Sequence, residues 1–215
     1  MKWWPWHRQP PAGPGRWVVL DVESSGLDPL HDRLLAIAAL GVRQVDGRLL
    51  AAPADSFEVV LRQRDADAAV PDRANILVHG IGLGAQRTGA EPAQALRAFL
   101  AFTDGAPLVA FHAGFDRILI TRAMRSVLQH RLDAIWLDLA DLAPALLPQL
   151  NAHALDDWLA HFGIRVAVRH QAAADTWATA ELLQRLWPLA LAQGCAARFD
   201  ALARLAASRR WLAGS

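Results

Sequence analysis

A short, almost continuous apolar segment near the start of the chain constrains the fold more than any other feature of the sequence. Trp17-Val18-Val19-Leu20-Asp21-Val22-Glu23 has the length and composition of a strand buried on both faces, and turn-forming residues follow it directly. A strand of this kind lies inside a sheet that has helices on both sides. The segment therefore favours an α/β fold in which two acidic residues stand at the end of a buried strand.

The pattern after this strand changes once, from strands to alternating helices and strands. Two further strands are predicted at 33–42 and 49–61, and a tight turn at 45–48 would make them an antiparallel meander with the first. The remaining predicted elements are strands at 107–111 and 135–139 and helices at 92–103, 114–127, 138–147, 153–162, 171–190 and 193–207. This order predicts an α/β domain with a mixed sheet covered by helices on both faces.

The chain divides into three segments. Residues 1–16 are rich in Trp and Pro and are interpreted as an irregular arm, 17–190 as the folded domain, and 191–215 as a C-terminal helix with a basic tail. The tryptophans of the arm would pack against the domain or dock on a partner, and packing is the favoured interpretation. The arm and the C-terminal helix are the candidate surfaces for a protein partner or for self-association.

Composition excludes several classes of protein. The 215 residues are 53% hydrophobic and 20% charged, which excludes a disordered polyelectrolyte. No run of about 18 uncharged apolar residues is present to span a bilayer. The single cysteine, Cys195, excludes an internal disulfide and a thiolate metal cluster. Because the start of the sequence lacks the apolar stretch of a signal peptide, we expect a cytoplasmic protein with no membrane partner.

Charge is distributed unevenly along the chain. The whole chain carries +1, whereas residues 1–17 and 193–215 carry +3 each, which leaves −5 for the body. An acidic body with basic ends fits a nucleic-acid binder whose site holds metal ions, because carboxylate ligands add negative charge. It also fits basic tails that only aid solubility, and charge alone favours this second interpretation.

Asp21 and Glu23 are unusual in a buried strand. Their spacing of two places both side chains on the same face, where like charges either raise a pKa or bind a cation. The alternative is that the strand ends at Leu20 and that water solvates both acids. The two interpretations are equally supported by this segment alone.

Two later segments add acids and a histidine at predicted helix starts. Asp116 lies in the first turn of a helix, where complementing the helix dipole would explain it without catalysis. His170 and Asp175 are five residues apart, a spacing that favours separate roles over a joint metal site on one helix face. Together, four carboxylates and one histidine suit Mg²⁺ or Mn²⁺ rather than zinc. They also suit two-metal phosphodiester hydrolysis with a histidine as general base.

These segments resemble the three motifs of the DEDDh family of 3′–5′ exonucleases, which includes the proofreading (epsilon) subunit of bacterial DNA polymerase III. A fourth segment resembles the family's sequence between the first two motifs, and the likeness extends from about residue 16 to 190. The four segments are Asp21-Val22-Glu23-Ser24-Ser25-Gly26-Leu27-Asp28-Pro29, Val78-His79-Gly80-Ile81, His112-Ala113-Gly114-Phe115-Asp116 and His170-Gln171-Ala172-Ala173-Ala174-Asp175.

The resemblance implies a ribonuclease-H-like fold with a five-stranded mixed sheet, of which the first three strands are antiparallel. It also implies two divalent cations, Mg²⁺ or Mn²⁺, held by Asp21, Glu23, Asp116 and Asp175, with His170 as general base. Glu23 would orient the 3′-hydroxyl and Leu27 would contact the terminal base or sugar. The implied substrate-binding residues are Ser24, Ser25, Gly26, Leu27, His79, His112 and Phe115. His79 would equally well cap a turn.

The sequence departs from the family pattern at two places. Phe111 and His112 replace the usual His-Asn of the second motif, which affects substrate contacts but removes no metal ligand. Ser24 and Ser25 replace the commoner Thr pair and keep the hydroxyl groups.

The expected activity is hydrolysis of single-stranded nucleic-acid 3′ ends to 5′-mononucleotides, with DNA favoured. An exoribonuclease or oligoribonuclease and a non-catalytic nucleic-acid-binding module of the same fold are the alternatives. Since no long C-terminal extension follows the domain, we expect a stand-alone or accessory exonuclease. Substrate contacts are expected to be local, with Trp136, Trp158, Trp177 and Trp187 in the core and with Arg117, Arg122 and Arg125 on a solvated helix face.

Overall fold

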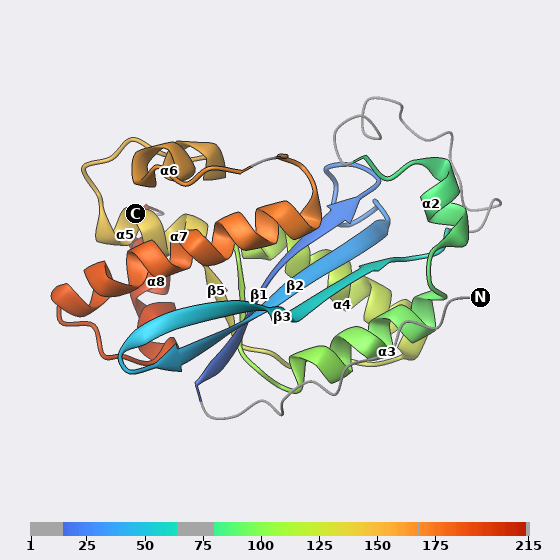
Figure 1. Cartoon of the computed structure of the whole chain (residues 1–215), viewed down its shortest axis with the longest axis horizontal. Coiled ribbons are helices and arrows are strands. Elements are labelled where there is room, and N and C mark those ends of the chain that lie inside the picture. The colour runs from blue at the N-terminus through green and yellow to red at the C-terminus, as the bar shows by residue number, and fades with distance from the viewer. Residues whose placement is uncertain (1–14, 64–79, 167, 214–215) are drawn as a thin grey trace.

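The sheet of this protein is built around its first strand. A computed structural model describes residues 15–63, 80–166 and 168–213, and Figure 1 shows its elements. The strands are β1 (Arg16–Ser24), β2 (Leu34–Val45), β3 (Arg48–Val60), β4 (Leu108–Ala110) and β5 (Trp136–Asp138), in the order β3-β2-β1-β4-β5. The pairs β1–β2 and β2–β3 are antiparallel, whereas β1–β4 and β4–β5 are parallel. The predicted meander and mixed five-stranded sheet are confirmed.

Two hydrophobic cores lie on opposite faces of the sheet. Helices α3 (Pro92–Thr103) and α4 (Ala113–Leu128) form one of them, and α5 (Leu139–Leu146), α6 (Leu155–Phe162), α7 (Ala172–Ala192) and α8 (Phe199–Ala213) form the other. Figure 1 shows α7 crossing in front of the sheet and α4 behind it. Val19 of β1 belongs to the core with α7, and its neighbours Val18 and Leu20 belong to the core with α3 and α4. Burial on both faces explains the continuous apolar pattern of this strand.

Two helices differ from the sequence prediction. Helix α2 (Leu83–Thr88) was not predicted, because six residues that include Gly84 are too short for a helical period to be recognised. Helix α8 begins at Phe199 rather than at 193, since α7 ends at Ala192 and Gly194 follows with a φ of 81°. Its apolar side chains Leu202 and Ala206 are buried in the core with α5.

A buried ion pair fixes the beginning of β1. The Arg16 guanidinium donates hydrogen bonds of 3.0 and 2.8 Å to the two oxygens of Asp55 on β3, and a further bond of 3.1 Å to the Phe102 carbonyl on α3. The Asp55 carboxylate lies directly over Gly41 of β2, where a Cβ atom would overlap it. Arg16, predicted to end the arm, is therefore the first residue of the strand, and arm residues 1–14 lie outside the described part of the chain.

Two of the expectations about side-chain burial are wrong. Trp158 and Trp187 are in the core as predicted, but Trp177 is 39% exposed, because two residues after Asp175 it faces outward from α7. Arg122 is half-buried rather than solvated, and its guanidinium donates to the carbonyls of Pro29 and Asp32. In the described ranges, none of the helices combines the length and the apolar character needed to cross a membrane.

Candidate active site

The candidate site lies at the end of β1, where the two helical layers meet. Odd-numbered residues of β1 face the layer that contains α7, so Asp21 and Glu23 point in the same direction as Val19. The structure therefore supports the first interpretation of these two acids: the strand continues to Ser24 and both lie within it. Asp116 comes from the first turn of α4 and Asp175 from the first turn of α7.

Electrostatic interactions show that these carboxyl groups are close neighbours. Burial, and then the charge of Asp175, raises the pKa of Asp21 to about 8. Burial, followed by the charges of Asp21 and Asp175, raises the pKa of Glu23 to about 8. Burial, and then the charge of Asp21, raises the pKa of Asp116 well above its ordinary value. Four acids from three elements thus share one site, in which the protein compensates their negative charge only poorly.

Backbone N–H groups hold three of these carboxylates in place. The N–H of Ala172, the first residue of α7, donates to the Glu23 carboxylate, and the N–H of Val22 donates to that of Asp116. Asp175 is only 7% exposed, and it accepts a hydrogen bond of 3.1 Å from the backbone N–H of His170. The carboxylates of Glu23, Asp116 and Asp175 are therefore each oriented by a backbone N–H of a neighbouring segment.

His170 stands at the mouth of the site. It lies two residues before α7, its side chain is exposed, and its backbone has a φ of 61°. This left-handed conformation is uncommon for residues other than glycine, but histidine tolerates it better than most. The conformation turns the chain so that the N–H of His170 reaches Asp175 while the imidazole remains accessible to solvent.

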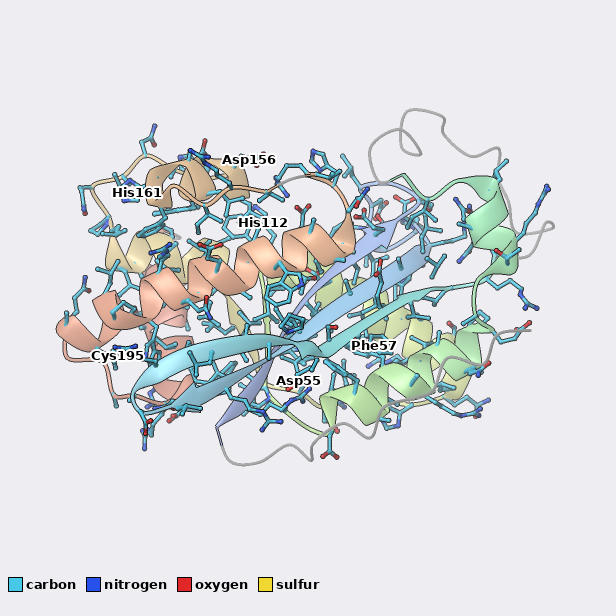
Figure 2. The ribbon with its side chains drawn as sticks, in the orientation of Figure 1. Asp55, Phe57, His112, Asp156, His161 and Cys195 are labelled. Atoms are coloured by element: carbon cyan, nitrogen blue, oxygen red, sulfur yellow. The ribbon has the colours of Figure 1, made fainter. Side chains whose placement is uncertain are left out.

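Arg169 is a residue of the site that sequence reasoning missed. Its guanidinium forms an ion pair with Asp175, and its Nε donates a hydrogen bond of 2.6 Å to Asp156 on α6, which Figure 2 labels. No local pattern marks Arg169, because its two partners come from different helices. Only its position directly before His170 could have drawn attention to it.

The loop between β1 and β2 is held by one carboxylate. Asp32 accepts hydrogen bonds from the Ser25 hydroxyl at 2.9 Å and from the Asp28 N–H at 2.8 Å, and it lies against Gly26, where a Cβ atom would overlap it. The hydroxyl of Ser24 donates to the Gly26 carbonyl. At the tip of this loop Leu27 is 93% exposed, an unusual position for an apolar side chain.

The second motif forms the turn from β4 into α4. His112 precedes α4 with a φ of 61°, and its backbone N–H donates a hydrogen bond of 3.0 Å to Asp138, the N-cap of α5. Asn and His both tolerate this conformation, so the replacement of Asn by His is compatible with the turn. The His112 side chain is exposed (Figure 2) and Phe115 is half-buried. His79 lies outside the described residues.

The donor set fits hard divalent cations. Carboxylate oxygens are the ligands that Mg²⁺ and Mn²⁺ prefer, and the raised pKa values show negative charge that the protein itself compensates only in part. Within the described ranges, no three His, Cys, Asp or Glu side chains are already arranged as a metal site. Binding of a cation would therefore require side-chain rearrangement, in particular at Asp175, where Arg169 engages one oxygen.

Comparison with known proteins defines the class of protein. Residues 18–183 match the family described as Exonuclease (RNase_T), and the chain therefore belongs to this exonuclease family. Its sheet and helices are those of the ribonuclease-H-like fold, and the resemblance noted in the three motifs is confirmed. The domain is that of a nuclease, a phosphodiester hydrolase.

Among related sequences, a DNA polymerase III subunit epsilon-like protein of Rhodobacter capsulatus is 34% identical over 180 residues, which is 82% of this chain and 24% of that protein. A PolC-type DNA polymerase III of Oceanobacillus iheyensis is 28% identical over 169 residues, which is 79% of this chain and 11% of that protein. The chain thus spans about a quarter of the first relative and about a tenth of the second.

Solved structures show the same fold at low sequence identity. Exonuclease I of E. coli in complex with a dT13 oligonucleotide has a TM-score of 0.65 and 19% identity, covering 83% of this chain and 42% of that one. The cell-death related nuclease CRN-4 has a TM-score of 0.69 and 13% identity, covering 81% of this chain and 64% of that one.

Proposed function

We propose that this protein is a metal-dependent 3′–5′ exonuclease that releases 5′-mononucleotides from single-stranded nucleic-acid 3′ ends, with DNA as the favoured substrate. The observation that carries the proposal is the convergence of four carboxylates from β1, α4 and α7 beside an accessible histidine. A purely structural acidic cluster would gain nothing from burying like charges together. A site that binds cations and then a phosphodiester explains the arrangement.

In the proposed mechanism, Asp21, Glu23, Asp116 and Asp175 hold two divalent cations, Mg²⁺ or Mn²⁺. When bound, such ions supply an activated water and stabilise the charge of the leaving oxygen. The protein contributes the orientation of these ligands through the backbone donors at Ala172, Val22 and His170.

His170 would accept the proton of the attacking water. Its exposed imidazole is accessible from solvent at the entrance of the site, while its backbone is anchored to Asp175. Glu23 would orient the 3′-hydroxyl of the strand. The loop that Asp32 organises would contact the terminal nucleotide through the exposed Leu27, and His112 and Phe115 would also contact the substrate.

The preference for DNA rests on the relatives. The sequence relatives are named as parts of DNA polymerase III, and E. coli exonuclease I is described in complexes with dT13 and dA16 oligonucleotides. Two-metal hydrolysis itself does not depend on the 2′ position, so sugar preference would come from contacts around Leu27 and His112.

The test is a time course on 5′-labelled single-stranded DNA and RNA of equal sequence, with Mg²⁺, Mn²⁺ or EDTA. We expect metal-dependent shortening from the 3′ end, faster on DNA, and no shortening with Asp21→Asn. Asp46→Asn is the matched control, because Asp46 is exposed in the β2–β3 turn and its φ of 48° is one that Asn tolerates.

Each other outcome of this assay contradicts a stated part of the proposal. Faster cleavage of RNA would show that the protein is an exoribonuclease rather than an exonuclease that prefers DNA. Cleavage by Asp21→Asn at the wild-type rate would show that Asp21 is not part of the catalytic site. Binding of either strand without cleavage under any metal condition would favour a non-catalytic nucleic-acid-binding module.

A further inference from the structure

A cationic side chain occupies the acidic site. Arg169 immediately precedes His170, and its guanidinium forms an ion pair with Asp175, one of the four converging carboxylates. The Arg169 charge also acts on Asp21 and Glu23, since it lowers the pKa of each and so opposes the effect of burial. Arg169 therefore supplies part of the positive charge that these acids need when no cation is bound.

The contact with Asp175 is well shielded from water. The Arg169 and Asp175 side chains are both largely buried, whereas Asp156, the second partner of Arg169, is mostly exposed on α6. Charge pairs gain strength when they are shielded from solvent, so the interaction with Asp175 is the stronger of the two. Asp156 in turn can retain the guanidinium at the edge of the site if its contact with Asp175 is lost.

A divalent cation and Arg169 require the same carboxylate. A cation coordinated by Asp175 Oδ1 would compete for the oxygen that accepts the guanidinium hydrogen bond, and at either oxygen its charge would repel the guanidinium over a short distance. The cation and the Arg169 guanidinium therefore each weaken the binding of the other to Asp175.

We propose that Arg169 is an internal competitor of the metal ion: it neutralises Asp175 in the metal-free protein and is displaced toward Asp156 when a divalent cation binds. Arg169 thereby stabilises the empty site and weakens its affinity for metal. This inference rests on the proposed metal-dependent function, because it assigns a second cation to the same carboxylates.

The test measures binding of Mn²⁺ alone to the full chain, by following free Mn²⁺ with electron paramagnetic resonance. We expect Arg169→Gln to lower the Mn²⁺ dissociation constant by about tenfold, since one competing positive charge is removed. Arg169→Lys keeps the charge and should restore an affinity close to that of the wild type. Arg165→Gln, at an exposed arginine four residues earlier, removes the same charge and should leave affinity within about twofold.

Thermal unfolding provides a second readout that does not depend on catalysis. In EDTA, Arg169→Gln should unfold at a lower temperature than the wild type, and saturating Mn²⁺ should raise its Tm by more than it raises that of the wild type. If Arg169 had only a structural role, Arg169→Gln would lower the Tm in EDTA and the Tm in saturating Mn²⁺ by the same amount. It would also leave the Mn²⁺ affinity unchanged.

The outcomes separate this inference from the proposed function. Unchanged or weaker Mn²⁺ binding by a folded Arg169→Gln protein overturns the competition, even if the wild type is an active exonuclease. Failure of the folded wild type to bind Mn²⁺ would instead contradict the metal-dependent function itself. If Arg169→Gln does not fold, Arg169→Lys decides: affinity well above that of the wild type would show that the charge is not the competitor.

Discussion

His112 and His170 share a backbone conformation that few residues adopt. Each has a φ of 61° and stands just before a helix whose first turn carries an acid of the candidate site, Asp116 or Asp175. In both cases the turn lets a backbone N–H reach a carboxylate, which is Asp138 for His112 and Asp175 for His170. At the scale of single residues, the backbone of each histidine therefore has a structural role that is separate from its imidazole.

This separation allows the role of the His170 imidazole to be tested. Asn tolerates the left-handed conformation, so His170→Asn should keep the N–H bond to Asp175 while removing the base. We expect kcat to fall by roughly 10²–10⁴, the range usual for a lost general base. The rise in Tm on adding Mn²⁺, measured by differential scanning fluorimetry, should persist; its loss would show that His170 is a metal ligand instead.

At the scale of elements, the β1–β2 loop is a rigid platform rather than a flexible connection. Asp32 binds the loop at two donors, Ser25 Oγ and Asp28 N, and Arg122 of α4 donates to the Pro29 and Asp32 carbonyls. These bonds connect the loop to the helix that carries Asp116. Leu27 can therefore remain exposed in a defined position at the end of β1.

Loss of this platform should affect substrate binding more than chemistry. Asp32→Ala removes the acceptor for Ser25 and Asp28 without touching the carboxylate cluster, so we expect KM for a single-stranded oligonucleotide to rise about tenfold with kcat within about threefold. Asp32→Asn keeps an acceptor and should recover most of the affinity. Steady-state kinetics on both variants would check this, and an equal loss of kcat would place the loop in the chemical step.

At the scale of the whole molecule, the buried carboxylates make stability depend on pH. The pKa of Asp21 is 3.8 in the unfolded chain and about 8 in the folded protein, because burial and Asp175 disfavour its charge. The folded state therefore keeps a proton that the unfolded state loses between these values. The contribution of Asp21 to the free energy of unfolding of the metal-free protein therefore falls as pH rises from 3.8 to about 8.

Asp21→Asn should remove part of this dependence. In EDTA above pH 8, wild-type Asp21 is charged. We therefore expect the Tm of the variant to exceed that of the wild type by at least about 2–4 °C. Below the ordinary Asp pKa the two proteins should differ little. Thermal unfolding across the pH range checks this, with Asp46→Asn as control; a variant that follows the wild-type curve throughout would contradict the assigned cause.

How much the sequence predicts depends on whether a feature is local. The spacing of Asp21 and Glu23 predicts a shared face, and the structure shows both within β1 next to Asp175. Helix α3 is predicted residue for residue at 92–103 because its start at Pro92 and its apolar period are both local signals.

Features that depend on tertiary contacts are the ones that sequence reasoning missed. Arg169 is recognised only when α6 and α7 are placed together, and Arg122 only when α4 is placed beside the β1–β2 loop. The wrong burial of Trp177 has the same origin, since an apolar residue in a helix indicates a core position only when its direction is known.

The location of the carboxylates between two helical layers has a consequence for biosynthesis. Asp116 arrives with the layer that contains α3 and α4, and Asp175 arrives with α7, which is made more than fifty residues later. A nascent chain that has docked only the first layer lacks one quarter of the acidic set and the neighbouring histidine. The proposed nuclease should therefore gain activity only after α7 has been synthesised and has packed against the sheet.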